Sequence, residues 1–430
     1  MKRANVFDLN WSNLITPLLL IAIRGLNTVS KFALSLYTAR YLGLSELGIY
    51  GLLVAGTTIL PAFAGFGTND WIGRQAARST LARVGPLMTT RLVLSVGFNL
   101  VLQVIAYVVN AVMGAPVPWP VLMLFSGVAL LEHLSDDAAI MLTYRGHVLL
   151  SNVLFFLRAG LWPIGVIAIG LLVPSARTLE MLIAGWLAGL VLMWIVLAAF
   201  VTRRNAWRYV RLDTRLLTEG IPQSVPFYLK DMSVATNLYI DRFLVSLLLG
   251  LELTGVYTFF WSIANVIHNL SLSAIFLPYL SNLVRSARES ISEFRELLVR
   301  VELRTVGFAV SLGVALIVAL PFLIPYVGRP LLAEHLSVFW IIVAATLFRV
   351  GVDSYNYVLV ALHHDRAIAI IALAAVPLSA ALYAVLIPLF GLGGASLAYL
   401  FTGVLLIIPR LVLSRRSAQT PNGAITQSSG

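Results

Sequence analysis

The chain has 430 residues, of which 59% are hydrophobic and only 11% are charged, and its mean hydropathy is +0.91. Soluble domains carry about 25% charged residues. A chain this poor in charge cannot cover a water-exposed surface, so the composition predicts an all-α, polytopic membrane protein. The net charge of +11 is expected to face anionic lipid rather than nucleic acid, because no basic patch is interleaved with aromatic residues. The absence of cysteine excludes disulfides and Cys-based metal sites.

Twelve apolar segments are long enough to cross a bilayer. The first is interrupted by Arg24 and Lys31 and lacks a small-residue cleavage site, so it is expected to be a retained span and not a signal peptide. In chain order the spans are expected at residues 14–38, 46–66, 87–110, 118–142, 148–173, 179–201, 222–249, 253–282, 304–327, 335–361, 366–390 and 391–413.

Lysine and arginine set the orientation of these spans. With the N-terminus inside, 20 of the 30 Lys and Arg residues fall on inner segments, and only Arg40, Arg177 and Arg329 fall on outer ones. Because inner loops carry the basic excess, we expect both termini in the cytoplasm.

Two inner segments, 202–219 and 284–304, are basic and amphipathic. Each is expected to be either a helix lying on the inner membrane surface or a solvated connector. The polar end of the chain, 417–430, is predicted to be a disordered cytoplasmic tail.

The chain contains an internal repeat. The segment from Tyr41 to Tyr50, YLGLSELGIY, matches LLGLELTGVY from Leu248 to Tyr257. Each opens a span, with a first glycine (Gly43, Gly250) that can end a helix and a second that allows close packing. The offset is 250 − 43 = 207 residues. A parallel repeat of six spans is typical of transporters. We therefore expect six-helix lobes at 1–201 and 220–416, joined by a basic linker at 202–219.

Charged and amide side chains lie within several spans, where each charge costs about 2.5–3.5 kcal/mol at the bilayer centre. They must therefore face inward, toward one another or toward a watery cavity between the lobes. The alternative for any one residue is a static salt bridge, such as Arg349 with Asp353 or Lys230 with Asp231. No His-x-x-x-His or Glu-x-x-His spacing accompanies the carboxylates, so no metal site is expected. The set comprises Arg24, Asn27, Lys31, Glu132, Asp136, Asp137, Arg158, Lys230, Asp231, Asn237, Asp241, His268, Arg349, Asp353 and Asn356.

The segment FALSLYTARYLGLSELGIYGLL at 32–53 and its repeat at 239–267, with Ile240-Asp241-Arg242, resemble the polysaccharide and O-antigen flippases of the multidrug/oligosaccharidyl-lipid/polysaccharide (MOP) exporter superfamily. The resemblance in organisation covers nearly the whole chain. It implies two six-helix bundles around a cavity that opens alternately to each side. The implied cargo is an undecaprenyl-diphosphate-linked oligosaccharide, in the cytoplasmic membrane of a bacterium that makes a surface polysaccharide such as O-antigen. A polysaccharide polymerase and glycosyltransferases are the expected partners.

A lipid diphosphate needs cations in the cavity, and arginine suits bidentate phosphate contact. The expected substrate-binding residues are Arg24, Lys31, Arg158, Lys230, Arg349, Asn27, Asn237 and Asn356. The expected charge-balancing or ion-coupling residues are Glu132, Asp136, Asp137, Asp231, Asp241, Asp353 and His268. No cofactor is expected apart from H⁺ or Na⁺ as a coupling ion. The alternatives are a small-molecule cation exporter of the same superfamily and a membrane enzyme, although the short outer loops hold no nucleophile–base pair.

Overall fold

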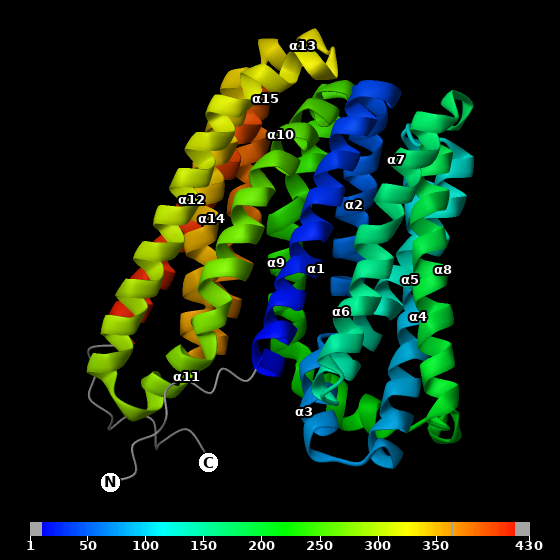
Figure 1. Ribbon diagram of the computed structural model, residues 1–430, viewed down its shortest axis with the longest axis vertical. Coiled ribbons are helices and arrows are strands. Elements are labelled where there is room, and N and C mark those ends of the chain that lie inside the picture. Colours follow the sequence, from blue (N-terminus) through cyan, green and yellow to red (C-terminus); the bar gives the residue numbers. More distant parts are fainter. Residues whose placement is uncertain (1–10, 363, 418–430) are drawn as a thin grey trace.

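The computed structural model describes residues 11–362 and 364–417, and every regular element within them is a helix (Figure 1). Nine helices in this part of the chain are long and apolar enough to cross a membrane. The last of them, α15 (Asp365–Ser417), contains a kink at Gly391, where φ is +56°. It therefore contributes two spans, as the sequence predicts. The protein is a multi-pass α-helical membrane protein.

The predicted spans of the first half each coincide with a long helix or helix pair. Two of these helices, α1 and α5, carry several of the intramembrane charges and are not among the nine helices counted above. Between α6 and α7 lies a single π turn, η2 (Leu157–Leu161), which contains Arg158. The elements are α1 (Trp11–Tyr37), α2 (Leu44–Ala64), α4 (Leu81–Val112), α5 (Trp119–Tyr144), α6 (Val148–Phe156) with α7 (Trp162–Leu172), and α8 (Leu179–Arg203).

The second half repeats this arrangement. Figure 1 shows α4 to α8 grouped on one side and α12, α14 and α15 on the other, with α1, α2, α9 and α10 between them. One boundary differs from the prediction: α12 begins 13 residues before the expected span at 304, because the amphipathic segment continues the same helix. The elements are α9 (Ile221–Leu249), α10 (Leu251–Leu270), α12 (Ile291–Val327), α14 (Leu336–Ala361) and the two parts of α15.

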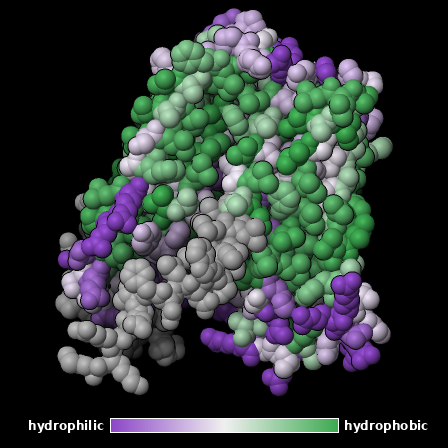
Figure 2. All heavy atoms as spheres, viewed as in Figure 1, coloured by the Kyte–Doolittle hydropathy of each residue, from purple (hydrophilic) through white to green (hydrophobic). Residues whose placement is uncertain are grey.

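Short helices mark the two ends of the molecule. The helices α3 (Thr68–Arg78) and α11 (Leu280–Glu289) lie at one end and α13 (Pro330–Glu334) at the other (Figure 1). Following the predicted orientation, we call the end with α3 and α11 the inner end and the end with α13 the outer end. Hydrophilic residues gather toward both ends of the face shown in Figure 2, and apolar residues cover the middle. This apolar band is the surface expected to contact lipid.

The two basic inner segments differ in structure. Residues 284–304 form the end of α11 and the first turns of α12, with a break at Ser290, so the second part of the segment continues directly into a long helix. The segment 202–219 is a connector instead, with a 3₁₀ turn at Ala206–Tyr209 followed by extended residues. It is tied to α4, because the Asp213 backbone N–H donates to Thr90 Oγ1 at 2.7 Å. The Arg215 guanidinium beside Asp213 lowers the pKa of that carboxyl. The predicted tail lies outside the described residues, apart from Ser417.

The repeat glycines bring the two halves together. A Cβ on Gly48 in α2 would lie 2.2 Å from the carbonyl oxygen of Leu251, and one on Gly255 in α10 would lie 1.8 Å from that of Leu44. The contact is reciprocal, as expected for a two-fold related pair. Only glycine allows these backbones to approach so closely. The prediction that both positions serve close packing is confirmed, and the structure adds that each helix packs against the other.

Candidate functional site

A cavity of about 620 Å³ lies between the two halves of the molecule. Its walls come from α1, α2, α5 and α6 on one side and from α9, α10 and α14 on the other. It begins at the α2–α10 contact, where Gly51 and Thr258 line it, and it reaches the inner ends of α5 and α6 at Thr143 and Val148. The cavity thus extends from the outer helix contact toward the inner end.

The outer end of this cavity is closed by contacts between the two halves. Besides the glycine contact, the Arg329 guanidinium donates to the Ala39 carbonyl at 2.9 Å and to the Arg40 carbonyl at 3.2 Å. The Arg40 guanidinium in turn lies 4.8 Å from the centre of the Tyr326 ring. These residues join the end of α1 to α12 and to the loop before α13.

The charged residues that line the cavity are all basic. They are Arg24, Lys31, Arg242 and His268, and the described lining contains no aspartate or glutamate. The nearby carboxylates lie behind the wall, each paired with a cation. An anion entering the cavity therefore meets positive charge before it meets any carboxylate.

The polar face of α1 forms one wall, as predicted. Arg24 and Lys31 are both exposed to the cavity, and Asn27 lies between them. Asn27 is only 4% exposed, and neither Oδ1 nor Nδ2 has a hydrogen-bond partner among the described residues. A buried amide without a partner is costly. Both amide atoms are themselves buried, with Oδ1 packed against Gly160 on η2, so the Asn27 amide lies within the wall and not on the surface of the cavity.

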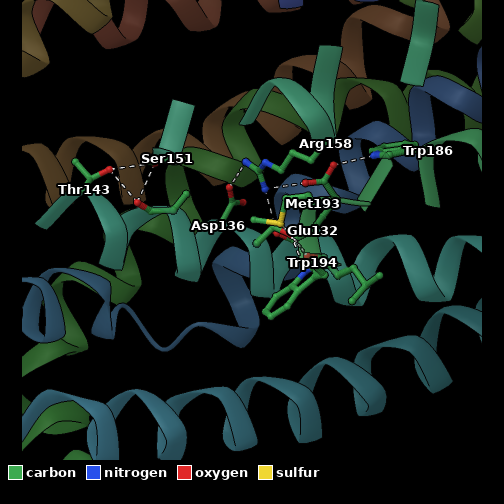
Figure 3. A network of polar contacts seen from close by, with 11 residues as sticks. Glu132, Asp136, Thr143, Ser151, Arg158, Trp186, Met193 and Trp194 are labelled. Carbon is green, nitrogen blue, oxygen red and sulfur yellow. Dashed lines mark hydrogen bonds and ion pairs between the residues drawn. The ribbon is translucent and has the colours of Figure 1, made fainter. Parts of the chain in front are cut away.

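A four-residue network, drawn in Figure 3, lies behind α1. Arg158 donates from Nη1 to Glu132 Oε2 at 2.9 Å and from Nη2 to Asp136 Oδ1, so one guanidinium bridges two carboxylates one turn apart on α5. The indole N–H of Trp186 on α8 donates to the other Glu132 oxygen at 2.7 Å. Arg158 does not line the cavity, and both its Nη groups are occupied. The structure thus places it in a scaffold rather than among the ligand-facing cations.

Asp137 points away from this network toward α4. It binds Arg91 through Nε at 3.0 Å and Nη2 at 2.6 Å, and Arg91 also donates to the Gly65 carbonyl and to Thr68. Arg91 and Asp137 are both nearly fully buried. Arg91 is a residue that the sequence analysis missed. Its signal was an arginine one turn inside a predicted span, with Asp137 on the next span.

The predicted residues of α9 are mostly structural. The Asn237 amide donates to the Ala372 carbonyl at 2.9 Å and accepts from Ser379 at 3.0 Å, which ties α9 to α15. Lys230 and Asp231 pair at 3.5 Å and do not line the cavity. This is the mutual pairing that the sequence left open as an alternative.

Asp241, farther along α9, is held by two neighbours. It accepts from the Tyr257 hydroxyl at 2.9 Å and pairs with Arg242 at 3.2 Å. Arg242, which the sequence analysis did not select, lines the cavity with its guanidinium 3.9 Å from the centre of the Trp261 ring.

Asp353 on α14 is the centre of a second buried network. It pairs with His268 Nε2 at 2.6 Å and lies 3.9 Å from Arg349 Nε. Asn356 links it to Arg410, whose Nε donates to Asn356 Oδ1 at 2.6 Å. Of these residues only His268 lines the cavity. Arg410, seven residues before the end of α15, is only 1% exposed.

Solved structures with the same fold are transporters. An outward-facing MATE multidrug resistance transporter of the MOP superfamily superposes with a TM-score of 0.61 at 14% identity, over 95% of this chain and 96% of that one. A MATE transporter in the straight conformation gives 0.58 at 14% identity, over 94% and 96%. A MOP superfamily transporter from Pyrococcus furiosus gives 0.57 at 12% identity, over 94% and 95%, and is described as having a binding pocket of reversed polarity. No curated protein is significantly similar to the chain in sequence.

The fold is therefore MATE-like, in a multi-pass membrane protein with a cavity between its two halves. The sequence model of the family described as "Polysaccharide biosynthesis protein" matches residues 38–327, which is more than half of the chain. The chain therefore belongs to the polysaccharide biosynthesis protein family.

Proposed function

We propose that the protein is a flippase that moves an undecaprenyl-diphosphate-linked oligosaccharide from the inner to the outer leaflet of the bacterial cytoplasmic membrane. The carried glycan would serve a surface polysaccharide. In this role the protein acts as a transporter and not as an enzyme. Both termini are in the cytoplasm, beside the glycosyltransferases that supply the substrate.

One observation supports this substrate above others, namely the positive charge of the side chains that line the cavity. Arg24 and Lys31 lie seven residues apart on one face of α1, about 10 Å along the helix at 1.5 Å per residue. Two exposed cations at this separation suit the phosphates of a lipid diphosphate. The polar and aromatic wall of α10, with Trp261, Ser262 and Asn265, then faces the sugar.

The multidrug-type exporter of the same superfamily remains the alternative function. A cationic drug would require a carboxylate that faces the cavity, because burying a charge without an opposite partner is costly. The described carboxylates nearest the cavity are engaged by Arg158, Arg242, His268 and Arg349. This arrangement favours an anionic substrate.

Movement of the substrate is proposed to occur by alternating access. In the conformation described here the α2–α10 contact and Arg329 close the outer end. Release to the outer leaflet requires these contacts to separate while the inner ends of the two halves approach each other. Small close-packed glycine contacts suit such a movement, since they can part without unpacking large side chains.

The test is complementation of a strain that lacks the gene, with surface polysaccharide as the readout. Arg24→Ala and Lys31→Ala are expected to lose most of the polysaccharide at normal protein levels. Arg300→Ala is the matched control, because Arg300 is an exposed arginine that pairs with Glu296 on the surface of α12. Wild-type polysaccharide from both cavity variants would contradict the proposed diphosphate site. Drug sensitivity with normal polysaccharide in the deletion strain would favour the exporter.

A further inference from the structure

Lys31 lies between the cavity and the carboxylate network on α5. Its side chain lines the cavity beside Asn27, and its nearest charged neighbours are Glu132, Asp136 and Arg158. Glu132, Asp136 and Arg158 are not part of the cavity lining. The Lys31 ammonium forms no ion pair with any carboxylate in the part of the chain that the structure describes. It is the one cavity cation whose field also acts on this network.

The network is not neutral by itself. With both carboxylates ionised, Glu132 and Asp136 carry two negative charges, and Arg158 supplies one positive charge. Its third hydrogen-bonding nitrogen, Arg158 Nε, has no partner among the described residues. The remaining negative charge is offset by the ammonium of Lys31, which lies near the two carboxylates without forming an ion pair with either. A charge left without compensation in a low-dielectric interior is destabilising.

A bound anion competes for the same ammonium. If a phosphate in the cavity draws Lys31 toward it, the α5 network loses its compensating charge. The network then gains affinity for another cation, either a proton or a sodium ion. By thermodynamic reciprocity, a cation bound at the network raises the affinity of the cavity for the anion by the same factor.

We propose that Lys31 is a shared counterion that couples the two sites, so that an anion in the cavity and a small cation at Glu132 and Asp136 bind together. This inference rests on the proposed function, because it assigns the coupling ion to a place beside the diphosphate site. Lys31 does not touch the bound cation. It acts indirectly, because its movement toward the anion removes positive charge from the Glu132–Asp136 pair.

The charged and titratable groups around this site come from four elements. Arg24 and Lys31 lie on α1, Tyr50 on α2, the two carboxylates and His133 on α5, and Arg158 on η2. His133 lies toward Asp137, with Nε2 3.9 Å from Oδ2, and so belongs to the neighbouring Arg91–Asp137 pair. Tyr50 is buried among apolar residues and stays neutral at physiological pH. Arginine does not titrate in this range either. Coupled uptake of a proton is therefore expected at the carboxylate pair.

The experiment measures binding of inorganic pyrophosphate to the purified full chain by isothermal titration calorimetry. Titrations in two buffers of different ionisation enthalpy give the protons taken up, and replacement of Na⁺ by choline at constant ionic strength gives the sodium dependence. The wild type is expected to take up a proton or a sodium ion as pyrophosphate binds. In Lys31→Gln the binding is weaker and this uptake is lost. Because pyrophosphate itself gains or loses protons on binding, a proton uptake is assigned to the network only when it also disappears in the carboxylate variants, which keep Lys31.

Removing one negative charge from the network is expected to change the pyrophosphate affinity in the opposite direction. In Glu132→Gln the network is already balanced by Arg158 and Asp136, so Lys31 is released to the cavity. Pyrophosphate is expected to bind about tenfold tighter, within the usual range of coupling between sites, with no cation uptake. Asp136→Asn tests the same point independently and leaves the Glu132–Trp186 hydrogen bond intact.

The outcomes separate this inference from the proposed function. Cation uptake that survives in Lys31→Gln, or unchanged affinity in both carboxylate variants, would overturn the shared-counterion proposal alone. Absence of pyrophosphate binding to the wild type would overturn the anion site and with it both proposals.

Discussion

Removal of the Arg158 guanidinium is the substitution that best separates scaffold from substrate site. In Arg158→Met, Glu132 and Asp136 lose their shared partner while the volume of the side chain is largely kept. The Asp136 side chain is 45% exposed and can be hydrated, whereas that of Glu132 is 13% exposed. The cost is therefore expected to come mainly from one buried carboxylate.

The size of that cost follows from the same contacts. Breaking a buried ion pair by removing one partner costs about 3–5 kcal/mol. Glu132 keeps its hydrogen bond from Trp186 at 2.7 Å, so the loss is expected at the low end, about 3 kcal/mol. At about 2 °C per kcal/mol for a large domain, the unfolding temperature should fall by roughly 6 °C.

The assay is thermal unfolding of a fluorescent fusion in detergent, followed by size-exclusion chromatography. Adding Glu132→Gln to Arg158→Met should recover most of the loss, because the unpaired charge is then removed. Arg24→Met is the matched control and should unfold at the wild-type temperature, since Arg24 is exposed to the cavity. The reasoning is refuted if Arg158→Met unfolds like the wild type, or if Arg24→Met loses as much stability.

Two further substitutions test other parts of the structure. Gly255→Val places a side chain 1.8 Å from the Leu44 carbonyl and should part the outer ends of α2 and α10. A single cysteine at Thr258, in a chain that has none of its own, should then react faster with an impermeant maleimide from outside; unchanged labelling would contradict the outer seal. Asp137→Ala should cost about 3 kcal/mol by leaving Arg91 unpaired, and the double variant with Arg91→Met should be more stable than Asp137→Ala alone. Equal stability of the two variants would show that this pair is not coupled.

The fold could be predicted from the sequence because lipid imposes a strong constraint on it. Each span must satisfy its own backbone hydrogen bonds, so apolar length locates the helices directly. Even the boundary between the last two spans, expected between residues 390 and 391, coincides with the kink at Gly391. The start of α12 was misplaced, since an amphipathic helix can continue a span without any apolar signal.

The site could be predicted only in part, for a different physical reason. The polar stripe of α1 was correctly expected to face a cavity, because Arg24, Lys31 and the small polar residues beside them recur on one helical face. The partner of each intramembrane charge could not be read from spacing along one helix. Asp353 lies four residues from Arg349, yet its closest partner is His268 on α10. In the sequence, Arg158 and Lys31 are both basic residues within an apolar span. Only the tertiary structure shows that Arg158 is paired with carboxylates and that Lys31 faces the cavity.

Transport of the lipid-linked glycan itself tests the account most directly. The purified protein is reconstituted into vesicles that carry an undecaprenyl-diphosphate-linked oligosaccharide, and a membrane-impermeant glycosidase reports the glycan that reaches the outer leaflet. We predict that the wild type exposes the whole pool, whereas the Arg24→Ala and Lys31→Ala variants protect the inner-leaflet fraction as protein-free vesicles do. Protection of that fraction by the wild type, or equal exposure by the variants, would contradict the claim that this cationic cavity carries the diphosphate.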